Sequence, residues 1–150
     1  MRQPTPELKD LAQRLLAHEA KKSLSPINLA EALEVCCERL HKGLDPLIGG
    51  GGFRALLNRA VYLAKKEHPW LNGVGIDDYP GCGLRALRDA IKGQEPAVIN
   101  ETFTAVLANV IWLLVTFIGE DIALSLIHET WPDAKIGATA SIVQRGSVDE

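Results

Sequence analysis

Apolar residues recur along most of the chain at the three- and four-residue spacing of an α-helix, and signals for β-strands are poor. The first such pattern follows Thr5 and Pro6, which combine an N-capping hydroxyl with a proline at the first helical position. Its apolar stripe consists of Leu8, Leu11, Ala12, Leu15 and Leu16. The spacing predicts a first helix that ends at about Ala20.

Two further helices are expected before the middle of the chain. A start signal at Pro26 opens a second helix, for which Gly43 is the expected stop. A third helix is expected from about Phe53 to the residue before Pro69. The apolar stripe of the second helix is Leu29, Leu33, Cys36, Cys37 and Leu40, and that of the third is Phe53, Leu56, Leu57, Ala60, Val61 and Ala64. Between them, the glycine run 49–52 predicts a flexible hinge that lets the third helix turn back.

The second half of the chain reads as a loop, three helices and a tail. Glycine, proline and acidic residues predict a loop over 71–83, and a short helix is expected over 84–91. The longest helical pattern covers 96–118, and a last helix runs from Glu120 to the Trp131–Pro132 pair. The tail, 133–150, has no sustained period, and we expect it to be flexible.

The longest helical segment, 96–118, is either the central helix of a bundle or a membrane-spanning helix. Residues 103–118 carry no charge, but a spanning helix needs about 20 apolar residues. Most apolar side chains of this segment share one broad face, and the opposite side holds Glu101, Thr102, Asn109 and Thr116. The sequence therefore predicts an all-α single domain over residues 1–132, a bundle of five to six helices around the long helix 96–118. No membrane association is expected.

Composition and charge narrow the class of protein. The chain has 150 residues and a mass of 16.3 kDa, which suits one domain, and its 47% hydrophobic and 23% charged residues are typical of soluble globular proteins. Its N-terminus has no apolar segment of a secretory signal, and its three cysteines form no C-x-x-C pair, so we expect a cytoplasmic protein.

The charge is distributed unevenly. Residues 53–92 carry seven basic and four acidic side chains, whereas residues 93–150 carry two and eight. This asymmetry favours complementarity within the chain or between subunits. The net charge of −3 lacks the basic excess of a nucleic-acid-binding protein.

Two candidate site patterns compete with structural roles for the same residues. Cys37 and His41 have a zinc-compatible spacing, with Cys82 as a further candidate ligand, but Cys37 lies on the predicted core stripe and no metal or other cofactor is expected. Gly51, Gly52 and Arg54 precede or begin the third helix, where an anion can bind, but the lysine of a phosphate-binding loop is missing.

A basic face of the third helix supplies the nucleic-acid alternative. It consists of Arg54, Asn58, Tyr62, Lys65 and Lys66, and it would have to be exposed and unpaired to touch a phosphate backbone. No nucleophile elbow, metalloprotease motif or other catalytic motif is found, so an enzyme is not favoured.

The long helix has a second candidate contact surface. Ala105, Asn109, Trp112 and Thr116 follow the 4-3-4 spacing of a heptad seam. This stripe either packs against the first helix of the same chain or forms a two-fold homodimer interface.

Segments 47–57 and 117–132 resemble small, all-helical bacterial proteins of a family without a known activity. The resemblance implies a bacterial cytoplasmic protein, and it carries no functional residue with it. Together these observations predict a non-catalytic helical interaction or regulatory module, with a homodimer as one option for its assembly. The alternatives are a ligand- or metal-binding protein or enzyme with a pocket between helices, and a helical nucleic-acid-binding domain.

Overall fold

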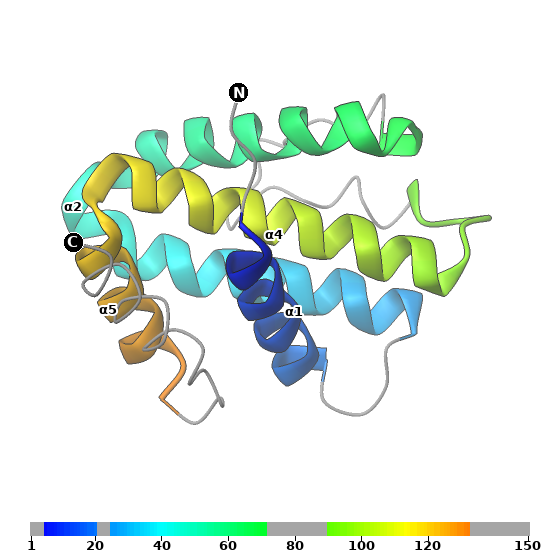
Figure 1. The fold of residues 1–150 in the computed structure, drawn as a ribbon, viewed down its shortest axis with the longest axis horizontal. Coiled ribbons are helices and arrows are strands. Elements are labelled where there is room, and N and C mark those ends of the chain that lie inside the picture. Colours follow the sequence, from blue (N-terminus) through cyan, green and yellow to red (C-terminus); the bar gives the residue numbers. More distant parts are fainter. Residues whose placement is uncertain (1–4, 21–24, 72–89, 133–150) are drawn as a thin grey trace.

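The computed structural model describes residues 5–20, 25–71 and 90–132, and every regular element in these ranges is helical. The elements are α1 (Pro6–Ala20), α2 (Pro26–Glu67), the 3-10 turn η1 (Pro69–Leu71), α4 (Pro96–Ile118) and α5 (Glu120–Thr130). In Figure 1, α4 runs between the two halves of α2, and α1 and α5 cover the bundle from the side. The predicted all-α bundle is confirmed. Cys82 and the predicted tail lie outside the described residues.

Local signals set most helix ends. The Thr5 hydroxyl accepts a hydrogen bond from the Leu8 amide at 3.2 Å, and the Ser25 hydroxyl accepts one from the Asn28 amide at 3.3 Å. Gly119, with φ of 94°, separates α4 from α5. These caps explain why the predicted bounds of α1, α4 and α5 agree with the structure.

The predicted helix end at Gly43 is wrong. The first half of α2 continues past Gly43 to Gly49, where φ is 75° and ψ is 170°, and the second half is a separate helical segment that ends at Glu67. A Cβ atom at Gly43 would lie 2.7 Å from Leu126 Cδ1 of α5. Glycine at position 43 therefore permits close packing of α2 against α5 and does not end a helix. The chain reverses at Gly49, within the predicted hinge.

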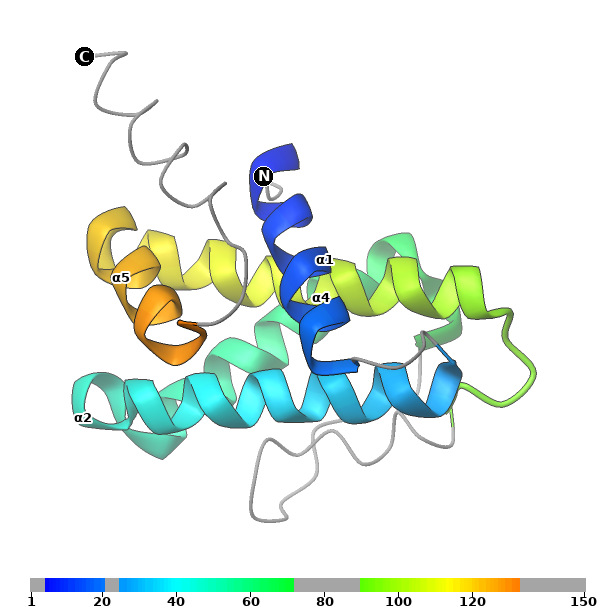
Figure 2. The same cartoon turned by 90° about the horizontal axis from the view of Figure 1, so that it is seen from below.

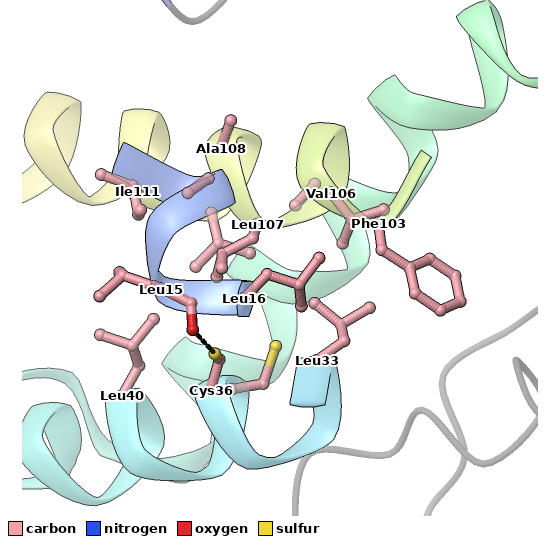
Figure 3. Packing of buried hydrophobic residues seen from close by; sticks show 14 of the residues in the cluster. Leu15, Leu16, Leu33, Cys36, Leu40, Phe103, Val106, Leu107, Ala108 and Ile111 are labelled. Atoms are coloured by element: carbon pink, nitrogen blue, oxygen red, sulfur yellow. Dashed lines mark hydrogen bonds between the residues drawn. The ribbon is translucent and has the colours of Figure 1, made fainter. Parts of the chain in front are cut away.

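The core forms where α1, α2 and α4 meet. Figure 3 shows leucines of α1, Leu33, Cys36 and Leu40 of α2, and the Phe103–Ile111 stretch of α4 packed together. By length and composition, α4 could cross a membrane. However, 61% of its most apolar 18-residue segment is buried inside the structure. This burial is typical of the core helix of a bundle.

The prediction that Thr102 and Asn109 face away from the core is wrong. Thr102 is fully buried and Asn109 is 6% exposed, because η1 covers Thr102 and the second half of α2 covers Asn109. The Thr102 hydroxyl accepts a hydrogen bond from Trp70 Nε1 at 3.1 Å, and Asn109 Nδ2 donates to the Ala60 carbonyl at 3.1 Å. Both polar groups are thus satisfied inside the bundle.

Phe117 is more exposed than the sequence predicts. It belongs to the apolar pattern of residues 103–118, which predicts a place on the core face of the long helix, but its side chain is 73% exposed. It lies in the last turn of α4, where the surrounding helices no longer cover it.

An ion pair and its hydrogen bonds join the end of α1, the first half of α2 and the end of α5. The Glu19 carboxylate of α1 is 8% exposed and lies 3.1 Å from Arg39 Nε of α2. It also accepts a hydrogen bond of 2.7 Å from the indole of Trp131, the residue that follows α5. Arg39 donates in turn to the Thr130 carbonyl at 3.4 Å. This cluster holds α5 against α1 and α2.

Candidate functional site

The cysteine pair of α2 belongs to the core. Cys36 and Cys37 are fully buried, as their place on the apolar stripe predicts, and Cys36 Sγ lies 3.8 Å from the Leu15 carbonyl. The His41 ring stacks on Phe53, with the centroids 5.1 Å apart and the planes 5° from parallel. Across residues 5–20, 25–71 and 90–132, no three His, Cys, Asp or Glu side chains are grouped to hold a metal ion.

The glycines predicted for anion binding lie in the first turn of the second half of α2, directly after Gly49. Gly51 and Gly52 are exposed, and Arg54 is half-buried. Nothing in the geometry tests an anion at this position, which stays a prediction.

The heptad-spaced stripe of α4 is mostly covered within the chain. Asn109 is bonded to α2 and not to α1, while Ala105 and Trp112 are half-buried and Thr116 is exposed. The Thr116 hydroxyl donates to the Trp112 carbonyl at 2.9 Å. A different stripe of α4, which includes Asn100 and Thr104, contacts α1. Self-association through the predicted stripe stays a prediction.

A polar cleft lies between α1, the end of α2 and the first half of α4. It encloses about 310 Å³. One wall is formed by Lys9 and Gln13 of α1 with Glu67 and His68 of α2. The other wall is formed by Asn100, Glu101, Thr104 and Ala105 of α4. Ala105 is the one apolar residue among these eight. It also belongs to the heptad-spaced stripe that the sequence predicts as a contact surface.

A hydrogen-bond network fixes the floor of the cleft. Gln13 Nε2 donates to Asn100 Oδ1 at 3.2 Å, and Asn100 Nδ2 donates to Gln13 Oε1 at 3.0 Å. The Thr104 hydroxyl donates to the same Gln13 oxygen at 2.8 Å. The network joins α1 to α4, and it holds the two amide groups in fixed orientations.

Sequence reasoning missed this cleft. Gln13 and Asn100 are 87 residues apart, and each belongs to a helix whose pattern marks only which face is apolar. The crossing point of α1 on α4 decides which polar residues meet. The spacing of Asn100 and Thr104 by one helical turn was the one available signal.

Large apolar side chains are exposed at the kinked end of the bundle. Leu47, Phe117 and Ile122 are each more than half exposed. Figures 1 and 2 place the kinked end of α2 and the corner between α4 and α5 at the same end of the bundle, but Figure 2 shows the two apart. Phe117 and Ile122 lie on either side of Gly119 at this corner, and we call these two residues the corner patch.

Contacts between α2 and α5 lie around Gly43. Arg39 contacts Thr130, and a Cβ atom at Gly43 would lie within 4 Å of both Leu126 and Thr130. These contacts mark the point where α5 crosses α2, and they do not place Leu47 against Ile122.

The second half of α2 exposes a basic stripe around an aromatic ring. Arg59 Cζ and Lys66 Nζ lie 5.7 Å and 5.1 Å from the centroid of Tyr62, which is exposed. Within the described part of the chain, no salt bridge joins Arg59, Lys65 or Lys66 to a carboxylate. Of the basic residues on the predicted nucleic-acid face, Lys66 is exposed, whereas Arg54 and Lys65 are half-buried. The nucleic-acid alternative stays a prediction, and the net charge of −3 disfavours it.

Comparison of the chain with protein-family models, with curated proteins and with solved structures found no match. The resemblance to small bacterial helical proteins therefore stays a prediction, and the argument for function rests on the surfaces described above.

Proposed function

We propose that the protein is a non-catalytic helical interaction module and that the corner patch binds its partner. The observation that carries this proposal is the exposure of Phe117 and Ile122 on either side of the turn between α4 and α5. Covering apolar surface is worth about 25 cal/mol per Å², so a cluster of large exposed apolar side chains favours association. Such clusters on soluble domains mark interaction surfaces.

The charge beside the patch favours a basic partner segment. Glu120 and Asp121 lie between Phe117 and Ile122 in the sequence, in the first turn of α5. Residues 93–150 carry eight acidic and two basic side chains. An amphipathic helix with apolar anchors and flanking lysines or arginines complements this surface, whereas a second copy brings the same acids.

The test uses a synthetic amphipathic helix of leucine and lysine as the partner, with a leucine–glutamate helix of the same pattern for comparison. Fluorescence anisotropy of the labelled peptides should show that the protein binds the lysine helix at least tenfold more tightly. Phe117→Ser and Ile122→Ser should each weaken that binding by about tenfold, since a buried large apolar side chain is worth about 1.5–3 kcal/mol.

Ile27→Ser is the matched control. Ile27 is 52% exposed and Ile122 is 54% exposed, and both lie in the first turn of a helix, but Ile27 lies outside the corner patch. The control should bind the lysine helix like the wild type. Equal weakening by Ile27→Ser and Ile122→Ser would contradict a localised site, and a wild-type dimer that Phe117→Ser dissociates would identify a second copy as the partner.

We also propose that the protein is soluble and cytoplasmic, which the burial of α4 supports. After expression and cell fractionation, the chain should remain in the soluble fraction without detergent. Recovery in the detergent-solubilised membrane fraction alone would contradict this proposal.

A further inference from the structure

Two helices of the bundle expose faces of opposite charge. The basic face of the second half of α2 has no acidic side chain, and its exposed side chains are Ala55, Asn58, Arg59, Tyr62 and Lys66. The acidic face of α5 has no lysine or arginine, and its exposed side chains are Asp121, Ile122, Ser125, His128 and Glu129. At about 100° per residue, each set covers about a third of the circumference of its helix. Each set is therefore one continuous surface.

The charges on the two faces have similar spacings. Arg59 and Lys66 are seven residues apart, which is about 10.5 Å along a helix. Asp121 and Glu129 are eight residues apart, which is about 12 Å. Among the described residues, no salt bridge joins any of these four charges to another side chain. Two helices that lie face to face can therefore form an ion pair at each end of the contact.

The middle of each face is complementary to the other in size. Tyr62 lies between the two cations of the basic face, and its side chain is 51% exposed. Ser125, a small residue, lies at the centre of the acidic face, and Ile122 beside it is 54% exposed. The tyrosine ring can pack over the serine and against the isoleucine. Such a contact covers apolar surface that a single chain leaves in water.

The two faces do not meet within one chain. In Figure 1, the second half of α2 lies above α4, and α5 lies below it. Figure 2 shows the same separation from below, with α5 in front and the second half of α2 behind. Contact between the basic face and the acidic face therefore needs two copies of the chain.

We infer that the protein associates head to tail, with the acidic face of α5 on one copy docked against the basic face of α2 on the next. This inference rests on the proposed function, because Ile122 belongs to both the corner patch and the acidic face, and it names the partner. A two-fold contact through α5 would bring the same acids together, whereas the head-to-tail contact pairs them with cations. Because the two surfaces differ, each copy keeps one of each free, and copies form chains or a closed ring.

Charge reversal on one face at a time tests the contact. At about 0.01 M salt, where exposed charges are weakly screened, light scattering should show the mean molar mass of the full chain rise with concentration from 16.3 kDa. One double variant reverses the basic face with Arg59→Glu and Lys66→Glu. The other reverses the acidic face with Asp121→Lys and Glu129→Lys. Each should weaken self-association by about tenfold or more, because attractive pairs become repulsive.

Two measurements restore complementarity and so separate the contact from a loss of folding. All four substitutions in one chain should bring self-association back, because both faces are reversed together. A mixture of the two double variants should associate for the same reason, although each variant alone does not. Circular dichroism of every variant verifies folding.

A matched control and an uncharged change complete the set. Lys9→Glu with Lys42→Glu alters the net charge as much as the reversal of the basic face does, but both residues are exposed on α1 and the first half of α2. This control should associate like the wild type. Tyr62→Ser should weaken association by about tenfold, since it removes the large side chain at the centre of the contact.

Several results would overturn this inference. They are a wild type that stays at the monomer mass up to millimolar concentration in low salt, a control that weakens association as much as the reversed basic face, and a mixture of the two double variants that stays monomeric. Binding of the leucine–lysine helix is measured separately. If that helix binds at Phe117 and Ile122 while the wild type stays monomeric, the proposed function holds and the head-to-tail contact fails. If charge reversal restores self-association but the helix does not bind, the head-to-tail contact holds and the corner patch fails as a peptide site.

Discussion

The Glu19 carboxylate lies among side chains of three segments, 2.7 Å from Trp131 Nε1 and 3.1 Å from Arg39 Nε. It is largely buried, so its two partners cannot be replaced by water without cost. The Asp10–Arg14 pair of α1 differs in both respects. Its side chains are about half exposed, and it joins neighbouring turns of one helix. The two carboxylate–arginine pairs therefore contribute differently to the stability of the fold.

Glu19→Ala should lower the free energy of unfolding by about 2 kcal/mol, because it leaves the buried Trp131 indole without its acceptor. Glu19→Gln keeps an acceptor oxygen and should cost about half as much. Urea unfolding followed by circular dichroism measures both changes. Asp10→Asn, in the exposed pair, should change stability by less than about 0.5 kcal/mol. Equal losses for all three variants would contradict a special role for Glu19.

At the scale of helices, glycines have three distinct roles in α2. Gly43 allows α5 to approach, Gly49 adopts a positive φ at the kink, and Gly51 lies in a helical turn with no atom within 4 Å of an added Cβ. Sequence position alone distinguishes none of them. A positive φ near an extended ψ is available almost exclusively to glycine, and it costs other residues about 1–3 kcal/mol.

Gly49→Ala should therefore lower the free energy of unfolding by about 1–3 kcal/mol. Gly51→Ala, two residues later, should raise it by about 0.5–1 kcal/mol, since alanine stabilises an open helical position. Thermal and urea unfolding of the two variants provide the comparison. If Gly51→Ala were as destabilising as Gly49→Ala, the kink would extend beyond residue 49.

Local signals account for the helix ends that the sequence predicts. Thr5, Ser25, Pro96 and Gly119 act through neighbouring backbone groups, so their effects can be read without the fold. Gly43 could not be read this way, since its role depends on Leu126, which is far away in the sequence. Gly119 thus separates two helices through its own backbone conformation, whereas Gly43 lies within a helix and allows a neighbouring helix to pack closely.

At the scale of the whole molecule, the arrangement of helices around α4 decides which surfaces are available. The sequence identified α4 as the central helix, but it could not show that both halves of α2 enclose it and bury Asn109. For the same reason, the polar cleft and the corner patch were not predicted. Each is made of residues from different helices, and its composition follows from where those helices cross or end.

This arrangement also bears on the stripe that was expected to pack within the chain or form a dimer seam. Asn109 is bonded to α2, and Trp112, one turn later, packs partly against the core. We therefore expect Trp112→Glu to lower the free energy of unfolding by about 2 kcal/mol, because it places a carboxylate against apolar side chains. Thr116→Glu, on the same stripe but exposed, should leave stability within about 0.5 kcal/mol of the wild type.

The pair of variants separates packing within the chain from a dimer seam. A seam between two chains would bring both positions into contact with the partner, so Thr116→Glu would dissociate the dimer as Trp112→Glu does, without loss of helix content. Packing within the chain makes Trp112→Glu alone destabilising and leaves the molar mass of every form unchanged. Light scattering for mass and circular dichroism for unfolding distinguish the two results. A wild-type dimer that Thr116→Glu converts to a monomer would show that the exposed end of this stripe, and not the corner patch alone, takes part in association.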